Sequence, residues 1–129
     1  MKKVVIITGA ANGVGKAIAK QLKEEELILI DIDEENLVNV SKELNSKYYV
    51  CDLSNDKDMI NMINKISKEY EKVDCLINCA ALWISGDMSK LDQNIFEEMN
   101  SLERIKKVLD TNIFATIGMI RSIFPIMKK

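Results

Sequence analysis

The chain has 129 residues, of which 47% are hydrophobic and 29% are charged, and its formal net charge is −2. This composition is that of an ordinary globular domain and excludes an intrinsically disordered chain. The balance of charges provides no basic stripe for nucleic acid and no polybasic patch for a membrane, so we expect neither partner.

The first 79 residues alternate between short apolar runs, which predict buried strands, and segments of helical period. The strands are expected at 3–8, 27–32, 48–51 and 73–79, and the helices at 14–23, 34–44 and 55–70. Such alternation with short connections requires a parallel sheet with right-handed crossovers. The prediction is therefore an α/β fold, a Rossmann-type doubly wound parallel sheet, in one domain over residues 1–129.

The pattern changes after residue 81. Residues 82–100 have no strand period and read as a loop with a short helix at most. A long helix is then predicted from Leu102 to near the chain's end, and we expect Pro125 to kink or end it. Its apolar positions are Ile105, Val108, Leu109, Ile113, Ile117, Ile120 and Phe124, and one face of this helix is expected to lack cover.

The cysteines and the first residues of the chain indicate in which compartment of the cell the protein is expected. Cys51, Cys75 and Cys79 are an odd number, and no histidine accompanies them, so we expect buried free thiols and no metal site. Cys75 and Cys79 would lie about 13 Å apart on one face of a strand, too far for a disulfide. The first apolar run has only four residues, too few for a signal peptide, so a cytoplasmic location is expected.

A glycine-rich turn, Thr8–Gly15, joins the first predicted strand to the first predicted helix and holds Gly9, Gly13 and Gly15. Glycines allow the backbone to turn tightly and to approach a pyrophosphate, while the N–H groups that open the helix face the anion. A helix cap with spare glycines remains the alternative interpretation.

Two aspartates follow neighbouring predicted strands. Asp31 ends the second strand, where a carboxylate can accept both hydroxyls of an adenosine ribose and repel a 2′-phosphate. Asp33 can cap the next helix, which would leave Asp31 free. No basic residue lies beside Asp31, and Asn12 fills the turn position where one would hold a phosphate, so NAD is favoured over NADP. Asp52 follows the third strand and could accept the amine of adenine or, equally, cap a turn.

The fourth predicted strand delivers Asn78, Cys79, Ala80 and Ala81 to the same edge of the sheet. The small side chains would let a nicotinamide ribose pass close to the backbone. Asn78 is polar within an apolar run, so it must be hydrogen-bonded if it is buried.

Taken together, these motifs resemble the short-chain dehydrogenase/reductase family, in its compact single-domain branch. The motifs are Thr-Gly-x₃-Gly-x-Gly at 8–15, Asp31, Asp52-Leu53, Asn-x-Ala at 78–80 and Asp110-x-Asn112, and they cover the chain in order. The resemblance implies cofactor contacts from Gly9, Gly13, Val14, Gly15, Asp31, Asp52, Leu53 and Ala80. It also implies that Asn78 braces the central sheet, and we include Asn12 and Asn78 among the candidate cofactor-binding residues.

Asn112 interrupts the apolar positions of the long helix and is expected to face inward. The resemblance implies that it shapes the active site and holds a water of the proton relay, whereas a buried asparagine that satisfies helix backbone is the alternative. The family's Asn-Asn-Ala-Gly is here Asn78-Cys79-Ala80-Ala81, which loses one polar contact. Trp83 could begin a substrate-facing surface or equally make a core contact.

The family's catalytic Tyr-x₃-Lys pair and serine have no counterpart in this sequence. The residues four positions after Tyr48, Tyr49 and Tyr70 are Asp52, Leu53 and Asp74. We therefore expect the cofactor-binding part of an oxidoreductase for an alcohol or carbonyl substrate, inactive unless another chain supplies the missing groups. Because the fourth strand would then be an unpaired apolar edge, we expect self-association there. A non-catalytic nucleotide-binding or interaction module is the alternative.

Overall fold

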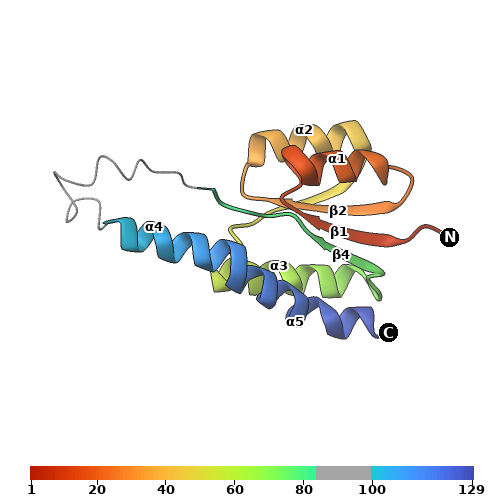
Figure 1. Ribbon diagram of the computed structural model, residues 1–129. Helices are drawn as coiled ribbons and strands as arrows, with labels where there is room; N and C mark the ends of the chain where they lie inside the picture. Colours follow the sequence, from red (N-terminus) through yellow and green to blue (C-terminus); the bar gives the residue numbers. More distant parts are fainter. Residues whose placement is uncertain (84–99) are drawn as a thin grey trace.

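The computed structural model describes residues 1–83 and 100–129, and its centre is a four-stranded parallel sheet (Figure 1). The strand order is β3-β2-β1-β4. The strands are β1 (Val4–Thr8), β2 (Glu26–Asp31), β3 (Lys47–Val50) and β4 (Cys75–Asn78). Within the described residues β4 lies at the edge of the sheet, so the predicted unpaired edge is present.

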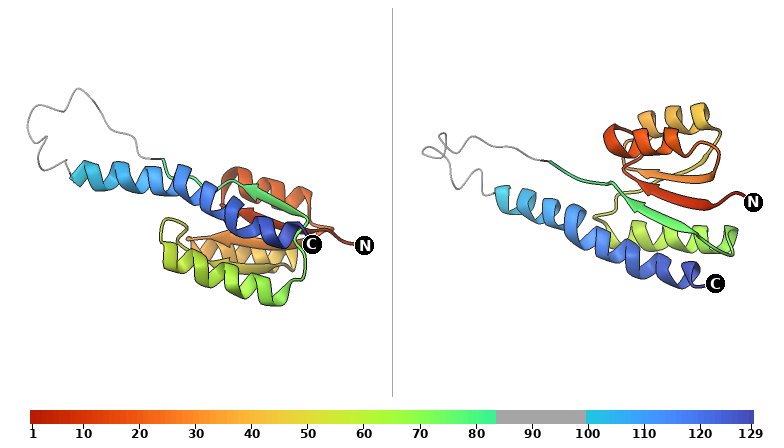
Figure 2. Two further views of the ribbon diagram at one scale, coloured as in Figure 1. Left: turned by 90° about the horizontal axis from the view of Figure 1, so that it is seen from below. Right: turned by 45° about the vertical axis from the view of Figure 1, so that its right-hand side comes forward.

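Helices cover both faces of the sheet, which confirms the doubly wound Rossmann-type fold (Figures 1 and 2). One face is covered by α1 (Gly13–Gln21) and α2 (Glu34–Leu44), and the other by α3 (Asp56–Glu69) and the C-terminal helix. Apolar side chains point to both faces, so the central strands read as continuous apolar runs. Ile6 and Ile7 are both fully buried, on opposite faces.

The predicted long helix has three parts. It consists of α4 (Asn100–Leu109), a π-helical segment, η2 (Asp110–Phe114), and α5 (Ala115–Met127). Figure 2 shows it running beside α3 on one face of the sheet. The π-helical segment was not predicted, because the spacing of four between Leu109, Ile113 and Ile117 also fits a regular α-helix.

Most of the apolar positions of this helix lie on an exposed face. Six of the predicted positions are 40–55% exposed, namely Ile105, Leu109, Ile113, Ile117, Ile120 and Phe124. The face that packs on the sheet and α3 instead consists of Ala115, Met119, Ile123 and Ile126. The helix carries two apolar faces, and helical period alone does not distinguish which of them meets the core.

Pro125 does not end the helix, since α5 continues to Met127. The proline lies in the last turn, where its missing N–H removes a single backbone hydrogen bond. The predicted loop at 82–100 lies mostly outside the described residues. Among the described helices, none combines the length and the apolar character needed to cross a membrane.

The three cysteines are free thiols, as predicted, but only Cys51 is buried. Cys75 and Cys79 are half-buried because β4 is an edge strand, and Cys79 lies one residue past its end.

Candidate functional site

A cavity of about 390 Å³ opens at the carboxyl edge of the sheet. It collects residues from the turn after β1, from the ends of β2 and β3, from the segment after β4 and from the long helix. The predicted cofactor residues that line it are Gly9, Asn12, Gly13, Val14, Gly15, Asp31, Asp52, Leu53 and Ala80. Residues separated by up to 71 positions in the sequence are thus brought together, at the sheet edge where ligands of open α/β folds bind.

Two of the glycines are required by close approaches of the backbone. A Cβ on Gly15 would lie 2.2 Å from the carbonyl oxygen of Gly9, and one on Gly9 would lie 2.7 Å from the amide nitrogen of Ala80. Gly9 also has a φ of +66°, in the left-handed region. The turn therefore packs directly on the start of α1 and on the segment that follows β4.

Gly13 differs from the other two. Its φ is +55°, and a Cβ there would meet no protein atom within 4 Å. Gly13 lines the cavity, so the space beside it belongs to the candidate site.

The start of α1 has no side-chain cap. Asn12 occupies the N-cap position in an extended conformation, but its side chain makes no capping hydrogen bond and the first turn contains no acidic residue. Its amide instead donates to Asp33 Oδ2 at 3.1 Å. The structure therefore does not support the alternative interpretation of the turn as a side-chain helix cap. The backbone amides of the first turn of α1 and the positive end of its dipole face the cavity.

Asp31 does not cap a helix, because Asp33 takes that role as expected, but its carboxylate is hydrogen-bonded to the backbone of the turn and of Asp33. Its Oδ2 accepts from the amide of Ala11 at 3.0 Å and its Oδ1 from the amide of Asp33 at 3.0 Å. These bonds fix the half-buried carboxylate in the cavity wall. Each oxygen keeps a second lone pair, so the group can still accept from ribose hydroxyls.

Asp33 caps α2, as expected, by accepting from the amide of Asn36. The side-chain amides of Asn36 and Asn12 also donate to Asp33, and these bonds hold the pKa of its carboxyl below its usual value.

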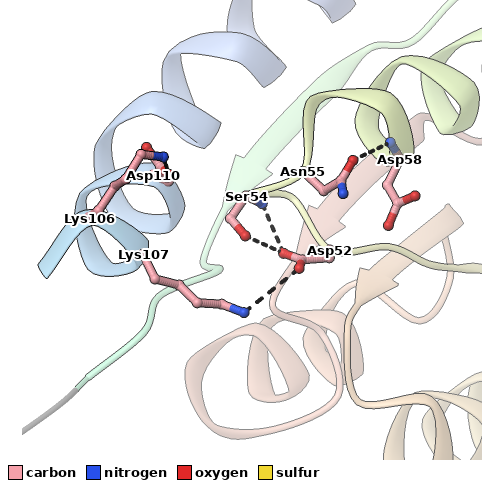
Figure 3. Close-up of polar contacts among 7 residues, drawn as sticks. All are labelled: Asp52, Ser54, Asn55, Asp58, Lys106, Lys107 and Asp110. Carbon is pink, nitrogen blue, oxygen red and sulfur yellow. Dashed lines mark hydrogen bonds and ion pairs between the residues drawn. The ribbon is translucent and has the colours of Figure 1, made fainter. Parts of the chain in front are cut away.

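Asp52 makes the turn cap that was one of its two predicted roles. Its Oδ1 accepts from the amide of Ser54 at 3.0 Å and from the hydroxyl of Ser54 at 2.6 Å (Figure 3). Its Oδ2 lies 3.9 Å from the ammonium of Lys107. Because the cap uses only one oxygen, the other retains acceptor capacity toward the cavity. Leu53 beside it is buried.

Thr8 is a positioning residue that sequence reasoning missed. Its hydroxyl, on a residue that is only 1% exposed, accepts from the amides of Cys79 and Ala80, both at 3.1 Å. This contact fastens the segment after β4 to the end of β1 and places Ala80 in the cavity wall. The signal in the sequence was a buried hydroxyl at the end of an otherwise apolar strand, since such a group needs a partner.

Asn112 and Asn78 differ from their expected surroundings. The Asn112 amide pairs with the backbone of Leu82 in both directions, accepting from its N–H at 2.7 Å and donating to its carbonyl at 2.9 Å. It therefore holds the segment after β4 against η2 and does not satisfy helix backbone. Asn78 is exposed and lies outside the cavity lining, and its bracing role stays a prediction. Trp83 is 88% exposed, so it makes no core contact.

Five further residues line the cavity without having been predicted to do so, namely Ile32, Cys51, Leu82, Lys107 and Thr111. Among the residues described by the structure, Lys107 is the only basic one that lines this cavity. Burial raises the pKa of the Cys51 thiol to about 11, so the thiol stays protonated at neutral pH. Within the described residues, no group of three potential ligands is placed to hold a metal ion.

Comparison with known proteins gives one consistent family. The family model described as short chain dehydrogenase matches residues 3–129. An NADP-dependent 3-hydroxy acid dehydrogenase of Schizosaccharomyces pombe is 31% identical over 133 residues, which cover 96% of this chain and 48% of that protein.

Solved structures give the same result. The ligand-free aldohexose dehydrogenase of Thermoplasma acidophilum matches with a TM-score of 0.75 and 26% identity over 98% of this chain and 44% of that one. A 4-hydroxyisoleucine dehydrogenase complexed with NADH matches with a TM-score of 0.75 and 29% identity, over 95% and 48% of the two chains. The chain thus spans about half the length of the proteins it matches.

Proposed function

This chain belongs to the short chain dehydrogenase family, and we propose that it binds NAD in the cavity at the carboxyl edge of its sheet. The observation that carries the proposal is the start of α1, which is uncapped, lacks acidic residues and lies in one cavity with Asp31. A helix start of this kind favours an anion, and a carboxylate one strand away favours a ribose.

Each part of the dinucleotide has a matching group in the cavity. The amides at the start of α1 would hold the pyrophosphate, and Gly13 would leave room for it. Asp31 would hold the adenosine ribose, and the available oxygen of Asp52 would accept the amine of adenine. The bound cofactor would supply or take the hydride of an alcohol–carbonyl reaction, with its nicotinamide end near Ala80.

The preference for NAD over NADP depends on Asp31. A fixed carboxylate at this position repels a 2′-phosphate, and the neighbouring N-cap position holds the neutral Asn12. One relative is named as NADP-dependent and one structural neighbour holds NADH. Family membership therefore does not determine whether this chain prefers NAD or NADP, and the proposed preference depends on Asp31.

We propose that this chain supplies the cofactor half of an oxidoreductase and does not turn over an alcohol or carbonyl substrate by itself. Its three tyrosines lack the lysine four positions on that would lower the tyrosine pKa in this family's reaction. The serine, tyrosine and lysine of that reaction would have to be supplied from outside these 129 residues. Asn112 would then shape the active site, through the segment that it holds at Leu82. The three free cysteines favour a cytoplasmic location.

The second candidate function, an interaction module, is favoured by the exposed apolar face of the long helix and by the edge of β4. That face contains Ile105, Leu109, Ile113, Ile117, Ile120 and Phe124. We propose that copies of the chain associate through this face and the strand edge. Light scattering at micromolar concentration should then report dimers or larger species, whereas a monodisperse monomer would contradict the proposal.

Calorimetric titration with NAD, NADP and ADP tests the cofactor proposal. We expect binding of NAD and ADP, weaker binding of NADP, and no turnover of mixed alcohols with NAD. Asp31→Ala should reduce the difference between the Kd for NAD and the Kd for NADP, because the carboxylate that repels the 2′-phosphate is removed. The proposal fails if the folded chain, verified by circular dichroism, binds no adenine nucleotide.

A further inference from the structure

Two adjacent lysines on α4 reach different partners (Figure 3). Lys106 lies 2.6 Å from Asp110, one turn along the same helix. Lys107 reaches from the helix to Asp52 at the end of β3, where its ammonium is 3.9 Å from the carboxylate oxygen that the turn cap leaves available. Lys107 lines the cavity of the candidate site, whereas Lys106 lines a neighbouring hollow.

The balance of charges around the cavity indicates that Lys107 affects the binding of an anionic ligand. Within residues 1–83 and 100–129, the charged residues that line it are Asp31, Asp52 and Lys107, so the two acids exceed the base by one. A dinucleotide brings a pyrophosphate with two further negative charges. The amides of α1 provide only partial positive charge, so each uncompensated carboxylate near the cavity opposes binding.

Building on the proposed NAD site, we propose that Lys107 is an affinity-determining residue of this site. Its ammonium offsets the charge of Asp52, which lets the available oxygen of Asp52 accept the adenine amine without adding to the repulsion of the phosphates. The 3.9 Å separation is loose enough for that oxygen to keep its acceptor capacity. The residue thus links the helix after β4 to the adenine end of the cavity.

The direct test replaces each lysine by methionine, which keeps the length of the apolar stem. Lys107→Met should weaken the binding of both NAD and ADP about three- to tenfold, the range for a partly exposed charge. Lys106→Met is the matched control, since its charge is paired outside this cavity, and it should change the Kd less than about twofold. Lys107→Arg keeps the charge and should retain most of the affinity.

Salt and a double-mutant cycle distinguish offset of charge from a general effect on folding. The loss caused by Lys107→Met should shrink as ionic strength rises, because exposed charges are screened. Asp52→Asn can still accept from Ser54 but removes the charge that Lys107 offsets. In that background, Lys107→Met should have much less effect on the Kd for ADP.

The outcomes separate this inference from the proposal it builds on. A wild-type chain that is folded and binds neither NAD nor ADP overturns both. A wild-type chain that binds them, with Lys107→Met indistinguishable from Lys106→Met, overturns only the role of Lys107. An equal loss from Lys107→Met with and without Asp52→Asn also overturns it, since the effect would then not pass through the acid.

Discussion

The start of α1 and the starts of α2 and α3 follow different rules, although all three helices begin at the carboxyl edge of the sheet. The N-caps of α2 and α3 are Asp33 and Asn55, and the side chain of each accepts a backbone N–H from the first turn. Both helices also carry acidic residues in that turn. At α1, Asn12 makes no capping bond and no acid follows it.

The difference is the one expected if the start of α1 is kept for a ligand, as we propose. A side-chain cap contributes about 1 kcal/mol, and a first-turn acid contributes about 0.3–1 kcal/mol. α1 forgoes both contributions, so its open amides and helix dipole remain available to an anion. The chain as a whole does not avoid caps, because the two neighbouring helices have them. The absence at α1 is therefore specific to the wall of the cavity.

The largest expected effect is on the unfolding free energy, and it distinguishes Gly15, which is packed against backbone, from Gly13, which lies beside the cavity. Gly15→Ala places a Cβ 2.2 Å from the Gly9 carbonyl oxygen, so backbone must move and we expect a loss of about 3 kcal/mol or more in unfolding free energy. Gly13→Ala meets no atom and pays only for its positive φ, about 1 kcal/mol. Urea unfolding of both variants measures the difference, and equal losses would contradict the geometry.

A second prediction gives α1 the acid that the other helices have. Val14 is in its first turn and is 71% exposed, so a substitution there disturbs no core contact. Val14→Glu should weaken NAD binding about tenfold, because a carboxylate competes with the pyrophosphate, while it stabilises the helix by a few tenths of a kcal/mol. Val14→Gln is the matched neutral control. If titration gives both variants the same Kd, the start of α1 is not the anion site.

A third prediction compares the effect of replacing the N-cap residue of α3 with that of replacing the N-cap residue of α1. Asn55→Ala deletes the acceptor for the amide of Asp58 and should lower the unfolding free energy by about 1 kcal/mol. Asn12→Ala deletes no cap and should stay within about 0.5 kcal/mol of the wild type. Thermal unfolding compares them, and a larger loss from Asn12→Ala would mean that α1 depends on its first residue after all.

The sequence was sufficient for the parts of the fold that depend on local pattern. Apolar period located the four strands and the first three helices. The spacing of Gly9, Gly13 and Gly15 located the turn, because the backbone approaches Gly9 and Gly15 too closely for a Cβ and Gly13 has a positive φ. The identity of the capping residue, Asp33, also followed from its position before α2.

Features that depend on distant contacts could not be predicted. The long helix has two apolar faces, and only the position of α3 and the sheet decides that Met119 and Ile123 are the buried ones. The partner of Asn112 is the backbone of Leu82, 30 residues away, and a backbone partner leaves no trace in the sequence. Lys107 is similarly separated from Asp52, and a lysine on a helix reads as an ordinary solvated residue.

The smallest effect concerns Asp33, which caps α2 and also holds Asn12 at the open start of α1. The hydrogen bonds from the side chains of Asn36 and Asn12 lower the pKa of this carboxyl from 3.8. Its contribution to stability is therefore fully present above pH 3.8 and is lost as the pH falls through the lowered value of the folded state.

Asp33→Asn keeps an oxygen for the cap but does not titrate, so the stability difference between wild type and variant should decrease as the pH falls below 3.8. Urea unfolding between pH 3 and pH 7 measures it, and Asn12→Ala, which removes one donor, should move the decrease to higher pH. Parallel curves for wild type and Asp33→Asn would show that this carboxylate does not couple the two helix starts.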